Sequence, residues 1–198
     1  MNSQGKNNTF KIVLSVGDES GIGPEIILKA LNSKTLEGNN EFILVGSKKI
    51  LQSTYQDLRS LGLENLANPD DLQIYDPKIS SHVKESKSNY GNSSFCYLTK
   101  AIEIVKQTPN SALVTGPICK KSWALAGHYF SGQTEVLAKL CGVKNVGMLF
   151  TAKSPITGWR FNTLLATTHI ALCDVPKRLN TKLIHAKLDL LKKFCITS

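Results

Sequence analysis

The chain has 198 residues, of which 41% are hydrophobic and 20% are charged, and its formal net charge is +9 at pH 7. This composition is typical of a globular protein with a sizeable core, and no apolar run approaches the length of a membrane span, which argues against a membrane protein. The basic residues are spread in ones and twos without interleaved aromatic side chains, so we predict a solvated surface and no nucleic-acid partner.

The N-terminal segment and the cysteines indicate the compartment. Residues 1–9 are polar, and we expect a flexible N-terminus there, while the apolar segment that follows is too short for a signal peptide. The five cysteines are odd in number and form no C-x-x-C pair or metal-site spacing. Free thiols fit a reducing compartment, so we predict a cytoplasmic protein.

Apolar runs alternate with amphipathic segments along residues 10–198. In chain order, the pattern predicts strands at residues 12–16, 42–45, 72–75, 112–115, 147–150 and 164–167. It predicts helices at residues 25–31, 48–61, 93–106, 134–141 and 181–194. This alternation is typical of an α/β fold with a mostly parallel sheet and helices on its faces. Residues 65–92 are polar and rich in turn formers, which leaves a long excursion or an edge hairpin open.

A glycine-rich turn joins the first predicted strand to the first predicted helix. Residues 17–25 read Gly-Asp-Glu-Ser-Gly-Ile-Gly-Pro-Glu. Glycines let the backbone adopt positive φ and approach a ligand closely, and Pro24 suits the first turn of a helix. Because the first-turn amides of a helix attract anions, the sequence predicts a ligand site near the N-terminus.

Polar residues also mark the ends of two later strands and the start of a helix. Thr115 and His169 lie at the carboxyl ends of apolar runs that we predict as strands. In open α/β sheets, ligands bind outside the carboxyl ends of the strands. Taken alone, His169 is a metal ligand, a general base or a polar group that closes a strand, and the last interpretation is favoured. Lys120 is a candidate point charge for a phosphate. Thr134 is either a helix cap or a phosphate contact, with the cap favoured.

The remaining histidines, His82, His128 and His185, stand at no spacing that completes a metal site, and we expect each of them to face solvent. The cysteines are interpreted as small buried hydrophobic residues. No residue is assigned to catalysis or to cofactor binding on pattern alone.

Four segments taken together resemble the family of 4-hydroxythreonine-4-phosphate dehydrogenase. The loop at residues 17–25 is similar to the family's glycine-aspartate-x-x-glycine-isoleucine-glycine-proline-glutamate motif. Residues 115–120 match its threonine-glycine-proline motif with a following lysine, and residues 166–169 match its alanine-threonine-threonine-histidine motif. Residues 132–135 match a glycine-histidine-threonine-glutamate turn with one change. The resemblance covers residues 10–196, with the motifs in the same order and spacing.

The resemblance implies a fold like that of the isocitrate and isopropylmalate dehydrogenases, and homodimers with the active site at the subunit interface. It implies NAD(P)-dependent oxidation of a phosphorylated substrate's secondary alcohol, followed by loss of carbon dioxide, in pyridoxal 5'-phosphate biosynthesis. It also implies a divalent metal (zinc, magnesium or cobalt) held by three histidines from both subunits, with His169 matching the first of them. Thr134 matches a substrate-phosphate contact, so Lys120, Gln133 and Thr134 are our candidate substrate-binding residues.

The sequence departs from the family pattern in two ways. Gln133 stands where the family has a histidine, and a carboxamide donates a hydrogen bond but cannot become cationic. The chain is also shorter than full members, so we expect a C-terminally truncated protein with an incomplete second half, without most of the NAD contacts and inactive on its own.

Three alternatives remain open. The chain is a non-catalytic remnant or half of a split enzyme, or it belongs to a related dehydrogenase for another phosphorylated hydroxy acid. A decarboxylating dehydrogenase of the isocitrate type ranks last, because Glu19 and Ser20 lengthen the loop beyond that group's pattern and the arginines are isolated.

Overall fold

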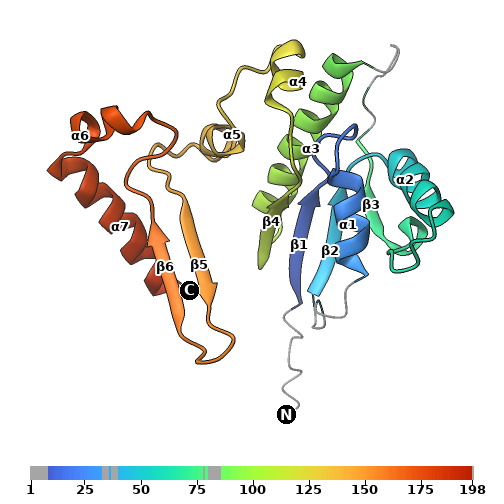
Figure 1. Ribbon diagram of the computed structural model, residues 1–198, viewed down its shortest axis with the longest axis horizontal. Coiled ribbons are helices and arrows are strands. Elements are labelled where there is room, and N and C mark those ends of the chain that lie inside the picture. The colour runs from blue at the N-terminus through green and yellow to red at the C-terminus, as the bar shows by residue number, and fades with distance from the viewer. Residues whose placement is uncertain (1–8, 33–35, 37–39, 78, 80–85, 198) are drawn as a thin grey trace. The chain divides into compact units, whose positions relative to one another are not determined.

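The computed structural model describes residues 9–32, 36, 40–77, 79 and 86–197. The chain divides into two compact units, unit 1 (Met1–Val136) and unit 2 (Leu137–Ser198), each of which is described by itself (Figure 1). The segment that we expect to be flexible, residues 1–9, lies outside the described residues apart from Thr9.

Unit 1 contains a four-stranded parallel sheet, as the sequence predicts. Its strands are β1 (Phe10–Ser15), β2 (Asn40–Val45), β3 (Gln73–Tyr75) and β4 (Ser111–Thr115), in the order β3-β2-β1-β4. Ser15 pairs with Val45 on one side and with Thr115 on the other, so these strands end together at one edge of the sheet. The order of the strands reverses between β1 and β4, which is where α/β sheets usually bind ligands.

Three helices connect these strands: α1 (Gly23–Leu31), α2 (Lys48–Ser60) and α3 (Lys87–Gln107), with a short 3-10 turn, η2 (Pro69–Asp71), before β3. Helices α4 (Lys120–Leu125) and α5 (Gln133–Cys141) follow β4, and the last residues of α5 belong to unit 2. Side chains of Ser47 and Ser86 cap the first turns of α2 and α3 by accepting backbone hydrogen bonds. The Ser86 cap explains why α3 begins at Lys87 and not at Ser93. The sequence predicts no helix at residues 120–125, because α4 is too short to show the spacing of apolar residues that is typical of a helix.

The core of unit 1 lies on both faces of its central strands. Val13 and Leu14 are neighbours in β1 and point to opposite faces, yet both are buried, and Leu44 and Val45 in β2 behave alike. A strand that is buried on both faces is characteristic of a parallel sheet covered by helices on each side. The predicted α/β class is therefore confirmed.

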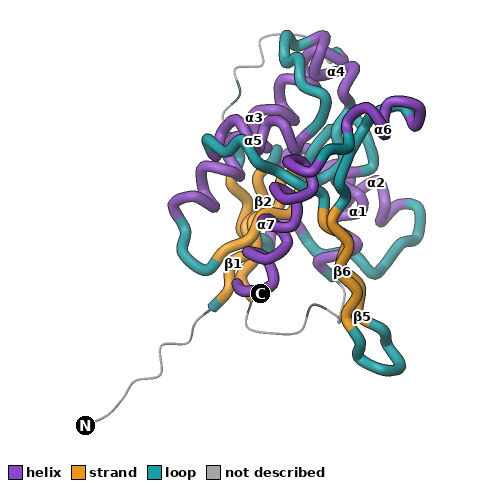
Figure 2. The backbone as a smooth tube through the Cα atoms, turned by 90° about the vertical axis from the view of Figure 1, so that its left-hand side faces the viewer, coloured by secondary structure: helices purple, strands orange, loops and turns teal. Residues whose placement is uncertain are grey.

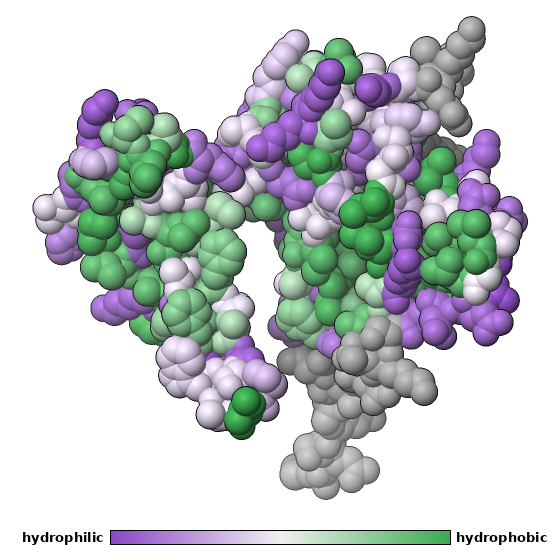
Figure 3. Space-filling model, viewed as in Figure 1, coloured by the Kyte–Doolittle hydropathy of each residue, from purple (hydrophilic) through white to green (hydrophobic). Residues whose placement is uncertain are grey.

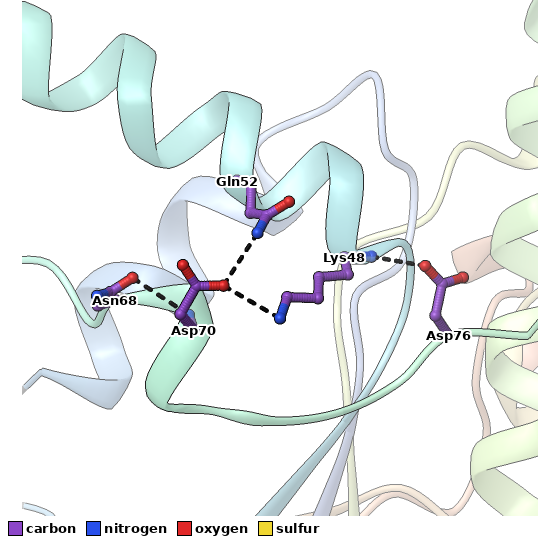
Figure 4. Close-up of polar contacts among 5 residues, drawn as sticks. All are labelled: Lys48, Gln52, Asn68, Asp70 and Asp76. Atoms are coloured by element: carbon purple, nitrogen blue, oxygen red, sulfur yellow. Dashed lines mark hydrogen bonds and ion pairs between the residues drawn. The ribbon is translucent and has the colours of Figure 1, made fainter.

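A polar cluster fixes the start of α2 beside the ends of β2 and β3 (Figure 4). The Asp76 carboxylate accepts a hydrogen bond from the Lys48 backbone N–H at 2.9 Å, while Lys48 Nζ lies 3.1 Å from Asp70 Oδ1. Gln52 donates to the same Asp70 oxygen, and the Asp70 backbone N–H donates to the Asn68 side chain. The hydrogen bond from Lys48, followed by the bond from Gln52 and the charge of Lys48, lowers the pKa of Asp70. The described part of the excursion at residues 65–92 therefore holds a parallel edge strand, β3, and the first turns of α3, and it forms no hairpin.

Unit 2 contains an antiparallel hairpin of β5 (Leu149–Lys153) and β6 (Arg160–Leu164), which lie side by side in Figure 2. The predicted strand bounds 147–150 and 164–167 are therefore wrong. The second strand is predicted too late in the sequence, because the prediction follows the apolar run Leu164–Ala166, which begins where β6 ends. Exposed strands with polar residues such as Arg160 and Asn162 carry a weaker signal. The unit ends with η3 (Leu172–Asp174), α6 (Val175–Arg178) and α7 (Thr181–Thr197).

Unit 2 lacks buried side chains among its described residues. Ile156 is 92% exposed and Leu172 is 86% exposed, and hydrophobic side chains lie on the visible surface of this unit (Figure 3). One contact within the unit joins α7 to the segment before β5, where Lys187 Nζ donates to the Val146 carbonyl at 2.6 Å. Within the described part of the chain, no helix is long and apolar enough to span a membrane.

Candidate functional site

The loops that follow β1 and β4 are bonded to each other where the strand order reverses. The Asp18 N–H donates to the Pro117 carbonyl at 2.8 Å, and the Gly116 N–H donates to the Ser15 carbonyl at 2.7 Å. A Cβ atom on Gly17 would lie 2.3 Å from the Pro117 oxygen, and Gly17 has a φ of 81°. This glycine therefore serves the contact between two loops, and not the close approach to a ligand that its motif predicts.

The acidic side chain of Asp18 occupies the turn that the sequence indicates as an anion site. Asp18 is buried, and its Oδ1 accepts hydrogen bonds from the Ser20 N–H at 3.0 Å and the Ser20 hydroxyl at 2.7 Å. The Gly21 N–H donates to the Asp18 carbonyl. The amides of Ser20 and Gly21 are therefore bonded within the loop, whereas the predicted anion site concerns the first-turn amides of α1 and stays a prediction.

The structure brings Lys120, Gln133 and Thr134 to one place in unit 1. Lys120 is the first residue of α4, and Gln133 and Thr134 are the first two residues of α5. A Cβ atom on Gly132 would lie 3.9 Å from Lys120 Nζ, so this ammonium group reaches the turn that begins α5. Thr134 lies inside the first turn, because α5 begins one residue earlier than expected, and it is not the helix cap. A cation, a hydroxyl and a carboxamide thus border one helix start, together with the Glu135 carboxylate, whose Oε2 would lie 3.4 Å from the same Cβ atom. The ammonium group, the hydroxyl and the helix N-terminus are the parts of this arrangement that suit an anionic ligand.

Close contacts with α3 hold α4, and with it Lys120. A Cβ atom on Gly91 would lie 2.0 Å from the Ser122 carbonyl oxygen, so the two helices approach at a distance that only glycine permits. The buried Trp123 indole N–H donates to the Ser94 hydroxyl at 2.6 Å, and that hydroxyl donates in turn to the Gly91 carbonyl. Lys120 is therefore carried by a short helix with a fixed backbone position.

A carboxylate and a phenol meet beside the loop after β1. Tyr97 of α3 donates a hydrogen bond to Glu19, which is half-buried. Burial is the main reason that the pKa of Glu19 is raised, and the charges of Asp76 and Asp18 act in the same direction, while the bond from Tyr97 opposes them. Burial, followed by the charge of Glu19, raises the pKa of Tyr97 above its ordinary value. No local sequence signal could pair Glu19 with a tyrosine so far along the chain.

The histidines and cysteines outside the candidate site lie in different environments. His128 is partly exposed and stacks on Phe95 with ring centroids 3.8 Å apart, and burial lowers its pKa. Hydrogen bonds from Ser122, first from its side chain and then from its backbone, lower the pKa of Cys119. Cys141, Cys173 and Cys195 are exposed and are not the buried residues that we expect. His185 is exposed as predicted, and His82 lies outside the described residues.

His169 lies in unit 2, on an exposed stretch after β6. Its φ is 55°, and it does not close a parallel strand, because β6 belongs to the antiparallel hairpin. In the residues that the structure describes, no three histidine, cysteine, aspartate or glutamate side chains come together as a metal site. A metal site needs three or four protein ligands, so the described residues do not fit a metal by themselves.

The described loops do not fit a nucleotide phosphate either. Such a site needs backbone amides that face the ligand and glycines that leave room for it. A Cβ atom on Gly23 would lie 2.2 Å from the Val16 carbonyl oxygen, and one on Gly116 would lie 2.3 Å from the same oxygen. These glycines face the protein's own backbone, so we assign no residue of this loop pair to a cofactor.

Comparison with protein families and curated sequences gives a consistent result. Residues 38–198 match the model of the family described as pyridoxal phosphate biosynthetic protein PdxA. The chain is 43% identical over 187 residues to a protein of Synechococcus sp. (strain RCC307) named 4-hydroxythreonine-4-phosphate dehydrogenase, covering 93% of this chain and 56% of that protein. A protein of the same name from Nostoc sp. (strain PCC 7120) is 42% identical, with 95% of this chain and 55% of that protein covered. The chain thus spans about half the length of these relatives.

Solved structures show a similar fold. The crystal structure of 4-hydroxythreonine-4-phosphate dehydrogenase from Klebsiella pneumoniae matches with a TM-score of 0.77 at 24% identity, covering 94% of this chain and 59% of that one. A structure of the same name from Burkholderia phymatum matches with a TM-score of 0.74 at 22% identity, covering 91% of this chain and 56% of that one.

Proposed function

The chain belongs to the PdxA family, and we propose on that premise that it forms part of an NAD(P)-dependent 4-hydroxythreonine-4-phosphate dehydrogenase. The whole protein would oxidise the secondary alcohol of this phosphorylated substrate, with decarboxylation of the product, in pyridoxal 5'-phosphate biosynthesis. One observation supports the assignment of this function to particular residues: Lys120, Gln133 and Thr134 come together at the start of α5.

These three residues form the site for the substrate phosphate in our proposal. Lys120 supplies the positive charge, and the Thr134 hydroxyl donates a hydrogen bond in the first turn of a nine-residue helix, whose N-terminal dipole favours an anion. Gln133 contributes a neutral carboxamide. The role of these residues is to bind and orient the substrate, and no chemical step is assigned to them.

His169 supplies one imidazole donor to a divalent metal in our proposal, and the other ligands lie outside the described residues. We also propose that the whole protein is a homodimer in the cytoplasm. The exposed apolar side chains of unit 2 support an assembly that covers them, and the five free cysteines support a reducing compartment.

A chimera tests the assignment to substrate binding. Residues 1–198 are fused to the remaining C-terminal part of the Synechococcus relative, and reduction of the nicotinamide is followed with 4-hydroxythreonine-4-phosphate. We expect Thr134→Val and Lys120→Met each to raise KM about tenfold, which corresponds to about 1.4 kcal/mol, with a smaller effect on kcat. Lys121→Met is the matched control. Equal effects at Lys120 and Lys121 would contradict the assignment.

The same chimera tests His169. His169→Ala is expected to lower both bound metal and kcat, whereas His185→Ala, at an exposed position of α7, leaves both unchanged. A polypeptide of residues 1–198 alone should show no turnover, because its described residues supply a single matching imidazole and no nucleotide site. Turnover by the polypeptide alone would refute that expectation. An inactive chimera that folds and binds metal would favour the remnant, and activity only with another phosphorylated hydroxy acid would favour the related dehydrogenase.

A further inference from the structure

Gln133 makes a contact that its place at the start of α5 does not predict. Its Nε2 donates a hydrogen bond to the Gly116 carbonyl at 2.9 Å, and the side chain is partly buried. The bond joins the first residue of α5 to the loop after β4. The donor and the acceptor thus belong to two segments that are not neighbours in one helix or one sheet.

The acceptor of this bond is a fixed point in the fold. Gly116 is buried, its own N–H donates to the Ser15 carbonyl, and a Cβ atom there would lie 2.3 Å from the Val16 oxygen. The next residue, Pro117, accepts the hydrogen bond from Asp18. Gly116 is thus held by β1 and the loop after it, so the Gln133 carboxamide attaches α5 to a rigid edge of the sheet.

We propose that Gln133 is a positioning residue of the phosphate site, which it serves through the Gly116 carbonyl. The inference rests on the proposed function above. The bond fixes the first turn of α5, which carries the Thr134 hydroxyl and begins beside the turn that Lys120 Nζ reaches. A carboxamide is neutral at every pH at which the protein is folded, so the bond acts without a protonation step. Charge recognition of the phosphate is left to Lys120.

The test uses the full 198-residue chain with inorganic phosphate as the probe and NMR titration as the measurement. Gln133→Met keeps the length of the side chain but removes the donor, and we expect the phosphate Kd to rise about tenfold. Gln133→Asn keeps the carboxamide on a shorter side chain that does not reach the Gly116 carbonyl, so we expect it to raise the phosphate Kd as Gln133→Met does. This variant shows whether the lost hydrogen bond, and not the lost polarity of the side chain, weakens phosphate binding. Gln52→Met is the matched control, because Gln52 also donates a side-chain hydrogen bond but lies on α2.

Two readouts separate positioning from direct contact. In the ligand-free protein, Gln133→Met should speed hydrogen exchange at the Val136 amide, because Val136 is the first residue of α5 whose N–H reaches an acceptor in its own helix. Thr134→Val should weaken phosphate binding about tenfold in the unmodified chain but only about twofold in the Gln133→Met background, because the hydroxyl is no longer held in place. Unchanged exchange together with additive effects would overturn the positioning role.

The outcomes also separate this inference from the proposed function. If phosphate binding depends on Lys120 and Thr134 but Gln133→Met leaves Kd unchanged, the positioning role fails and the proposed function stands. If the unmodified chain binds no phosphate, the assignment of the phosphate site to Lys120 and Thr134 is refuted, and the positioning role of Gln133 is refuted with it.

Discussion

Tyr97 of α3 donates a hydrogen bond to Glu19 in the loop after β1, which joins a helix on one face of the sheet to the loop at its edge. The contact leaves Glu19 half-buried beside two other carboxylates, and burial raises its pKa above 4.5. The folded protein therefore binds a proton at Glu19 more strongly than the unfolded chain does. The stability from this group is fully present below about pH 4.5 and is lost as pH rises through the raised pKa.

Glu19→Gln should stabilise the protein at about pH 8 and change little at about pH 4, because the amide stays neutral and still accepts the bond from Tyr97. We expect a gain of about 1 kcal/mol at the higher pH, after allowing for solvent screening. Urea unfolding at the two pH values measures it, with the exposed Glu64→Gln as control. The same effect at both values would show that the charge of Glu19 is not its source.

Gly91→Ala should destabilise the chain, because the new Cβ would lie 2.0 Å from the Ser122 carbonyl oxygen. The expected cost is about 1–3 kcal/mol, although alanine alone favours a helix by about 1 kcal/mol over glycine. The denaturation midpoint measures the change. In the matched control, Gly21→Ala, the nearest atom is 3.5 Å away and stability should stay within about 0.5 kcal/mol. A stabilised Gly91→Ala variant would contradict the close packing of α3 and α4.

Ser94→Ala should cost about 1–3 kcal/mol, because the buried Trp123 N–H loses its acceptor. Trp123→Phe removes the donor, so the double variant should cost clearly less than the sum of the two single changes. Equilibrium unfolding of the four proteins gives the coupling energy. Strict additivity would mean that this hydrogen bond contributes nothing to the α3–α4 contact.

Alkylation should distinguish Cys119 from Cys96. Hydrogen bonds from Ser122 lower the pKa of Cys119, whereas burial raises the pKa of Cys96. Because the thiolate is the reactive form, iodoacetamide at about pH 7.5 should modify Cys119 before Cys96. Mass spectrometry maps the order in which these two thiols react. Ser122→Ala should slow that reaction. Modification of Cys96 before Cys119 is the result that would reject this order.

The sequence predicts the parallel sheet of unit 1 well, because Val13 and Val45 lie in apolar runs that are buried on both faces. It fails at β6, where strand residues such as Asn162 are exposed and polar and the apolar run lies just beyond the strand. It also predicts that the glycines of the loop at residues 17–25 leave room for a ligand. Sequence letters do not reveal that the room beside Gly17 is filled by the Pro117 carbonyl, since that contact depends on the folded position of β4.

The candidate site shows the same limit. Lys120 and Thr134 can be selected from motifs, and the structure brings them to one helix start. The hydrogen bond between Gln133 and Gly116, and the anchoring of α4 through Gly91, depend on tertiary contacts between segments with unrelated local patterns.

The pairing of β1 with β4 bears on how the chain is made. Lys11 pairs with Ser111, so β1 leaves the ribosome long before one of its two neighbours exists. At about 5–20 residues per second, the apolar β1 has one unpaired side for several seconds during synthesis. An unpaired strand edge invites pairing with other chains, so this interval is when the nascent protein most needs a chaperone.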